Sequence, residues 1–216
     1  NYAASWARQL LFSRHRLTGW VPGNYTGFPL FQMYFPLPFA LIAALSLALD
    51  PNVAFKLVTV LGLATLPLAA YHVLVRARTP YPGPALGASL VLLFLFQDAN
   101  SMWGGNLAST LAGEFSYSIS LPIALVYLGM LAGALRSWRV AVIAAGLVGV
   151  LALTHAYTVL WVACASAFLL TLRGPSVPRL ARLAIVFGGA AALCAFWLLP
   201  LVWYAPWTTA YRHLWV

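Results

Sequence analysis

The chain has 216 residues, of which 63% are hydrophobic and only 7% are charged. A soluble domain carries charge at about a quarter of its positions, so this composition excludes a water-soluble fold and places the chain in a lipid bilayer. The net charge of +9 does not indicate nucleic-acid binding, because the basic residues stand in ones and twos between apolar runs rather than on one polar face.

The opening stretch is amphipathic and then rich in proline and aromatic residues, and no part of it is apolar enough to cross a membrane. The first apolar run, 35–49, is shorter than the roughly 20 residues that a spanning helix needs. It begins Phe-Pro-Leu-Pro and ends at Asp50 and Pro51. We therefore expect a juxtamembrane helix that lies at the membrane surface.

Further apolar runs follow at 53–75, 84–97, 115–135, 140–154, 157–172 and 182–199. Arginines fall between them at 76–78, 136–139 and 173–182, and two runs separate each group from the next. All three groups can therefore face the cytoplasm, as the positive-inside rule requires. The sequence predicts an all-α, polytopic membrane helix bundle with about six spanning helices. We expect a single transmembrane domain over 1–216, with an outer loop at 1–51, the helix bundle at 52–200 and a further outer loop starting at 201–216.

Two of the three acidic residues, Asp98 and Glu114, lie in one polar segment between the second and third of these runs. A carboxylate near a membrane is costly unless it is solvated, paired or bound to a cation. The helix dipole alone would explain Glu114, which stands at the start of a helix. The alternative is a carboxylate at a water-filled pocket. On that interpretation Glu114 is catalytic, Glu114 and Asp98 are ligands of a divalent metal such as Mg or Mn, and Asn106 binds substrate.

His155 stands at the tip of the helical hairpin formed by 140–154 and 157–172. A single histidine is more often structural, but this one is predicted to share the outer side with Glu114, which favours a catalytic role. Aromatic residues gather on the same side, either as an interfacial belt or as surfaces on which sugars stack. We take Tyr25, Trp103 and Tyr157 as candidate substrate-binding residues.

Four blocks of sequence carry a family resemblance: WVPGNYTGFPLFQMYFPLP, WGGNLASTLAGEFSYSISL, LALTHAYTVLW and AFWLLPLVWYAPWTT. In this order and at these separations they resemble the large prokaryotic membrane proteins related to 6-pyruvoyl-tetrahydropterin synthase, although the chain shows no pterin chemistry. That family resembles in turn the GT-C type membrane glycosyltransferases, which take sugars from polyprenyl-phosphate carriers. The resemblance covers nearly the whole chain.

The resemblance implies a GT-C-like fold in a prokaryotic plasma membrane, with the active site on the non-cytoplasmic face. Glu114 would lie in the second outer loop, and His155 would face the same cavity. The expected partners are membrane lipid and a polyprenyl-phosphate-linked sugar. Arg212 is a candidate for contact with the phosphate of the lipid carrier; the alternative is that its side chain is simply a charge exposed to solvent. The first spanning helix and the catalytic acidic residue of the first loop would precede Asn1, so we expect an N-terminally truncated fragment that is inactive alone.

Two other classes of function stay open. Discontinuous helices and buried polar tips also mark substrate sites in transporters and lipid flippases. Ion coupling would need acidic residues within the helices, and none is predicted there, which argues against this class. A non-catalytic membrane scaffold is the third possibility.

Overall fold

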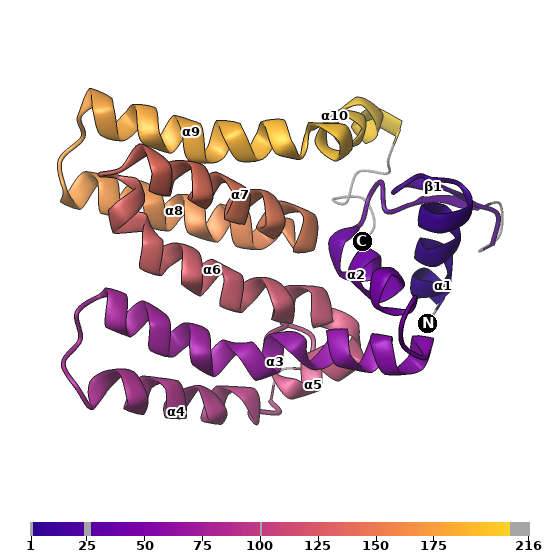
Figure 1. The fold of residues 1–216 in the computed structure, drawn as a ribbon, viewed down its shortest axis with the longest axis horizontal. Helices are drawn as coiled ribbons and strands as arrows, with labels where there is room; N and C mark the ends of the chain where they lie inside the picture. The colour runs from indigo at the N-terminus through magenta and orange to yellow at the C-terminus, as the bar shows by residue number, and fades with distance from the viewer. Residues whose placement is uncertain (1, 24–26, 100, 208–216) are drawn as a thin grey trace, which may run out of the picture.

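The computed structural model describes residues 2–23, 27–99 and 101–207. Its main body is a bundle of helices that lie side by side and alternate in direction (Figure 1). Each of the six apolar runs expected to span the membrane lies wholly or mainly in one helix, which confirms the predicted helical class. These helices are α3 (Pro51–Arg76), α4 (Gly83–Leu95), α6 (Phe115–Ala134), α7 (Trp138–Thr154), α8 (Ala156–Leu172) and α9 (Val177–Leu193).

The two ends of the bundle differ in their polar residues. The connections from α3 to α4, α6 to α7 and α8 to α9 lie together at the left of Figure 1, and arginines gather in them and in the adjoining helix ends. We call this the arginine end. Three further arginines, Arg8, Arg14 and Arg16, lie in the N-terminal segment. The starts of α3, α6 and α8 and the ends of α4, α7 and α9 lie at the opposite end, with His155 between α7 and α8. We call this the histidine end.

A small N-terminal unit packs against the histidine end (Figure 1). It contains α1 (Tyr2–Arg8), a π-helical turn (Gln9–Ser13), a hairpin of β1 (Gly19–Val21) with β2 (Phe28–Leu30), and α2 (Leu37–Leu45). The hairpin is a local exception to the all-α expectation. Buried side chains from the unit and from the starts of α3 and α6 form one apolar core, with Phe31 and Phe115 on either side of Phe39.

Helix α2 has nine residues, fewer than the expected run of 35–49. At about 1.5 Å per residue, a helix of this length is too short to cross a bilayer. This length is compatible with a helix that lies along the membrane surface. The chain then turns into α3 at Asp50, whose Oδ1 accepts a hydrogen bond of 2.9 Å from the Asn52 backbone N–H. Pro51 occupies the first turn, where its missing N–H costs nothing.

The run expected at 182–199 is not one straight helix. It breaks at Cys194, and α10 (Ala195–Tyr204) leads on through a 3₁₀ turn (Ala205–Trp207) at an angle of 77° to α9. Two contacts tie α10 to the N-terminal unit: Trp197 Nε1 donates to the Phe31 carbonyl at 2.8 Å, and Gln32 Nε2 donates to the Trp197 carbonyl at 3.2 Å. These long-range bonds favour the bend, which hydropathy does not encode.

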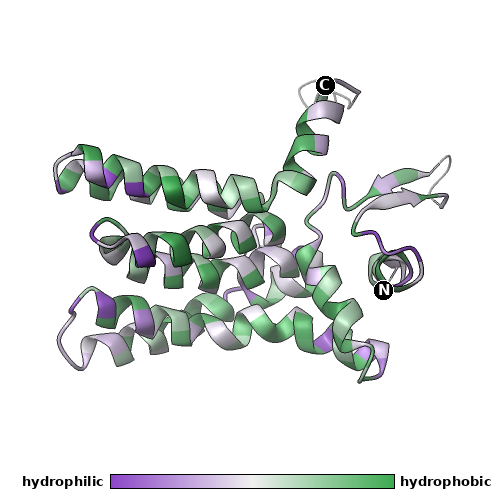
Figure 2. Ribbon diagram, turned by 45° about the horizontal axis from the view of Figure 1, so that its top comes forward, coloured by the Kyte–Doolittle hydropathy of each residue, from purple (hydrophilic) through white to green (hydrophobic). Residues whose placement is uncertain are grey.

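Most of the bundle consists of hydrophobic residues, drawn in green in Figure 2, and the hydrophilic residues, drawn in purple, concentrate toward its ends. Within the described ranges, α3 and the continuous segment Leu107–Ala134 are long and apolar enough to cross a membrane, and α9 with α10 is a third candidate if a bent pair is one span. Helices α4, α7 and α8 are apolar but shorter. The chain therefore has the helices of a membrane protein, and the count of about six spans stays a prediction.

Candidate functional site

Glu114 lies at the histidine end, where a short irregular segment leads into α6. This segment is one turn of helix, α5 (Leu107–Ser109), followed by a π-helical turn (Thr110–Glu114). Gly113 has φ of +125°, a conformation that favours glycine, and it allows the chain to turn just before the carboxylate. Ser118 Oγ lies 3.2 Å from the Glu114 carbonyl, to which it donates, and 2.6 Å from the Thr110 hydroxyl, which fixes the turn onto α6.

His155 joins α7 to α8 through one residue of extended backbone, with φ of −165° and ψ of 108°. Its carbonyl accepts hydrogen bonds from the backbone N–H and the hydroxyl of Thr158, at 3.2 and 2.7 Å. The residue is only 7% exposed. Three aromatic rings surround the imidazole: the centroids of Phe35, Tyr117 and Tyr157 lie 4.4, 5.1 and 5.4 Å from that of His155.

The dipeptide Tyr34–Phe35 connects the surroundings of Glu114 with those of His155. Phe35 packs on the His155 ring, and the Tyr34 ring lies 5.3 Å from that of Phe35. Burial and then the negative charge of Glu114 raise the pKa of Tyr34, and the Ser116 hydroxyl beside it lowers that pKa by less. Tyr34 therefore keeps its proton near the carboxylate, and residues from the N-terminal unit, α6 and the α7–α8 tip converge at one place.

His155 Nδ1 is a buried polar atom of this cluster that has no hydrogen-bond partner among the described residues. Ser116 Oγ makes no bond of hydrogen-bond geometry with any of these residues either, but the Tyr34 hydroxyl lies beside it. Buried polar atoms are almost always paired, so unpaired ones indicate places where a ligand or water binds. The histidine end therefore offers a carboxylate, a phenol, an imidazole and a hydroxyl to a polar ligand.

His155 makes stability depend on pH. Burial lowers its pKa to about 4 from the usual value near 6.5. Between these values the unfolded chain binds a proton that the folded chain does not, so the free energy of unfolding falls as pH falls. Between about pH 7 and pH 4.5 we expect a loss of about 2 kcal/mol from this residue. Thermal unfolding of the purified protein in detergent, compared with His155→Phe, should show it. An equal pH dependence in both proteins would contradict the assignment.

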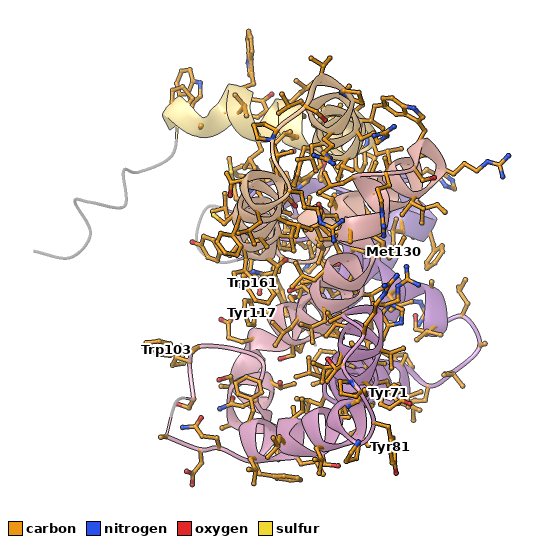
Figure 3. All side chains as sticks on the ribbon, turned by 90° about the vertical axis from the view of Figure 1, so that its left-hand side faces the viewer. Tyr71, Tyr81, Trp103, Tyr117, Met130 and Trp161 are labelled. Carbon is orange, nitrogen blue, oxygen red and sulfur yellow. The ribbon has the colours of Figure 1, made fainter. Side chains whose placement is uncertain are left out.

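The structure places the other predicted site residues unequally. Tyr157 contacts His155 and is 71% exposed, so it is available to a ligand. Trp103 is 80% exposed on the loop before α5 and projects at the edge of the molecule (Figure 3). Asn106 is buried, and its side chain caps α5 by accepting from the Ser109 N–H at 2.9 Å, while Nδ2 donates to the Gln97 carbonyl at 2.7 Å. These bonds give Asn106 a structural role.

Asp98 is exposed just beyond α4, at the same end as Glu114. Among residues 2–23, 27–99 and 101–207, no group of three or more His, Cys, Asp and Glu side chains comes together to hold a metal ion. The metal site at Glu114 and Asp98 therefore stays a prediction with no third ligand of these types in the described part of the chain. Tyr25 and Arg212 lie outside the described residues.

Sequence reasoning did not select Tyr34, Phe35, Ser116 and Tyr117 as site residues. Their signal was weak, because each stands in a segment whose composition is typical of apolar or interfacial regions. The alternation EFSYSIS at the start of α6 was the available hint, since its three serines are all buried in the structure. Polar residues that are buried at a helix start mark a position where packing and hydrogen bonding matter.

Residues 31–215 match a family model described as the 6-pyruvoyl-tetrahydropterin synthase related domain, a membrane protein. A search of curated proteins and a search of solved structures find no significant match. The family match includes the Tyr34–Phe35 dipeptide, the segment that ends at Glu114, the His155 tip and the bent pair of helices α9 and α10. Because the match extends over most of the sequence, the chain belongs to the 6-pyruvoyl-tetrahydropterin synthase related family of membrane proteins.

Proposed function

We propose that this chain forms the membrane core of a glycosyltransferase that takes a sugar from a polyprenyl-phosphate carrier. The observation that supports this most is the connection between Glu114 and His155 through Tyr34 and Phe35. It places a carboxylate and a neutral imidazole at one end of an apolar bundle, among aromatic rings on which a sugar can stack. The class of reaction in this proposal is taken from the resemblance of the family to GT-C enzymes.

In the proposed reaction Glu114 is the general base. It takes the proton from an acceptor hydroxyl as that oxygen forms a bond to the anomeric carbon of the sugar. The bond from that carbon to the phosphate oxygen breaks, and the polyprenyl phosphate leaves with the electron pair. The lowered pKa makes His155 a weak base, so its role is to hold a sugar hydroxyl through neutral hydrogen bonds. The protonated Tyr34 hydroxyl is a second donor to the sugar.

A groove beside His155 has the character needed for an isoprenoid chain. It has a volume of about 360 Å³, lies between α7, α8, α9 and α10, and includes Tyr157 and Trp197 in its walls. Most of its other lining residues are aliphatic, such as Leu160 and Leu198. The carrier lipid would lie in this groove with its phosphate toward the aromatic cluster. The resemblance implies that Arg212 contacts this phosphate, but Arg212 lies outside the residues that the structure describes.

Release of sugar from a labelled polyprenyl-phosphate donor tests the proposal. The full-length protein is reconstituted in proteoliposomes, and His155→Phe is compared with the unchanged protein. Phenylalanine keeps an aromatic ring against Phe35 but removes both ring nitrogens, so we expect about 100-fold slower release. No release by the unchanged protein from any polyprenyl-phosphate hexose or pentose would reject the proposal. Unchanged release in the variant would remove His155 from the site.

A lipid or solute transporter is the second candidate, and the 77° break between α9 and α10 favours it. Broken helices expose backbone groups that bind substrates in transporters. Asp50 and Asp98 lie outside the helices and Glu114 stands at the break before α6, so an ion-coupled mechanism lacks carboxylates in the body of a helix. Movement of a fluorescent polyprenyl phosphate between leaflets of the same proteoliposomes, without sugar release, would support the transporter instead.

A further inference from the structure

A second cavity lies at the arginine end, away from the aromatic cluster. Figure 3 looks onto this end of the molecule. The cavity has a volume of about 420 Å³ and lies where the ends of α3, α6 and α8 meet. Four arginines line it, and they come from three separate connections of the chain: Arg76, Arg78, Arg136 and Arg173. The rest of its wall is largely apolar.

The positive charges of this cavity have no carboxylate partner in the chain. The only acidic residues are Asp50, Asp98 and Glu114, and all three lie at the histidine end. Four guanidinium groups around one cavity repel one another, and the chain itself offers no side-chain anion to offset that repulsion. An anion from outside the chain is therefore the natural partner. All four arginines are exposed, so such an anion can reach them.

The hydrogen bonds of the arginines leave their outer nitrogens available. Arg76 donates through Nε to the Gly129 carbonyl at 3.3 Å, and Arg136 through Nε to the Ala132 carbonyl at 3.0 Å. These two bonds orient the guanidinium groups without using the paired terminal nitrogens. Within the described part of the chain, the side chains of Arg78 and Arg173 make no hydrogen bond. Paired terminal nitrogens match the oxygens of a phosphate.

Two general effects favour arginines at this end but do not explain the cavity. The negative ends of helix dipoles attract cations, and cytoplasmic loops of membrane proteins are rich in arginine. Either effect is satisfied by an arginine that points away from the other arginines. Arg139 is exposed at the start of α7 and does not line the cavity. The convergence of four arginines in one cavity needs a further cause.

We propose that this cavity binds the headgroup phosphate of an anionic phospholipid. The site stands at the ends of α3 and α6, the two helices long enough to cross a membrane among the described residues, where lipid phosphates lie. Apolar residues such as Leu128 and Leu169 form part of the wall, and an acyl chain can continue along them. A small soluble anion would gain nothing from that apolar surface. Basic pockets between spanning helices are suited to anionic headgroups in this way.

The experiment measures phospholipid binding to the full-length protein in detergent by native mass spectrometry. Phosphatidylglycerol and phosphatidylcholine with identical acyl chains are titrated separately. We expect bound phosphatidylglycerol to exceed phosphatidylcholine, and Arg136→Gln to weaken its binding about fivefold.

Two further variants separate the cavity from overall charge. Arg139→Gln removes the same charge from the start of α7, near Arg136 in the sequence but outside the cavity, and should leave binding within about twofold of the unchanged protein. Ala132→Leu keeps every charge and fills the cavity from α6, so it should weaken binding of phosphatidylglycerol at least about fivefold.

Three results would overturn the proposal. Equal weakening by Arg136→Gln and Arg139→Gln would mean that lipid responds to overall charge and not to the cavity. Undiminished binding in Ala132→Leu would exclude the cavity as the place of binding. Competition by glycerol 1-phosphate at the concentration at which phosphatidylglycerol binds would identify a soluble phosphate as the ligand, because the acyl chains would then contribute nothing.

Discussion

Replacing Glu114 with glutamine should reduce sugar release from a polyprenyl-phosphate donor by about 1,000-fold, if the proposed reaction is correct. Glutamine has nearly the shape of glutamate but cannot take a proton from the acceptor hydroxyl. The backbone of the turn should be unaffected, because Ser118 binds the carbonyl of residue 114 and not its side chain. The measurement is the rate of sugar release by the full-length protein in proteoliposomes.

Asp50→Asn is the matched control for this substitution. It also removes one negative charge from the histidine end with little change of shape, and asparagine can still cap α3 by accepting from the Asn52 N–H. We expect its rate to stay within about twofold of the unchanged protein. Equal losses in Glu114→Gln and Asp50→Asn would show that the end of the bundle needs negative charge in general. Full activity in Glu114→Gln would refute its role as the base.

The helices were predictable because each is an apolar run that is bounded by clear signals. Arginines follow α3 and α8, and Asp50 with Pro51 precedes the body of α3. Such signals act within a few residues, so they can be recognised in the sequence. The arginine groups also predicted correctly which connections lie at the same end of the bundle, because helices in a row alternate in direction.

The site was less predictable, because it depends on contacts between distant parts of the chain. Phe35 meets His155 through packing of the N-terminal unit, and no local pattern encodes that contact. The same holds for Trp197, whose indole bonds to the carbonyl of Phe31, 166 positions earlier. Asn106 shows a role that its residue type alone did not reveal: its side chain caps α5, and its binding of a substrate stays a prediction.

The position of Glu114 depends on how closely α3 packs against α6. A Cβ atom added at Gly62 would clash with the carbonyl group of Ser118, so the two backbones are in close contact at this point. Ser118 Oγ in turn accepts from the Gly105 N–H at 3.2 Å and pairs with the Thr110 hydroxyl at 2.6 Å. The close contact of the two helices is thus connected to the loop and the turn that lead to Glu114.

Gly62→Ala should therefore lower stability and activity together. Backbone atoms cannot move aside as a flexible side chain can, so α3 and α6 must separate, at a cost of about 3 kcal/mol. Gly146→Ala in α7 is the control, because nothing lies within 4 Å of a Cβ at that position. We expect it to be neutral or slightly stabilising, since alanine favours helix more than glycine does. Unfolding of both variants in detergent measures the difference, and equal stability would contradict the backbone contact between α3 and α6.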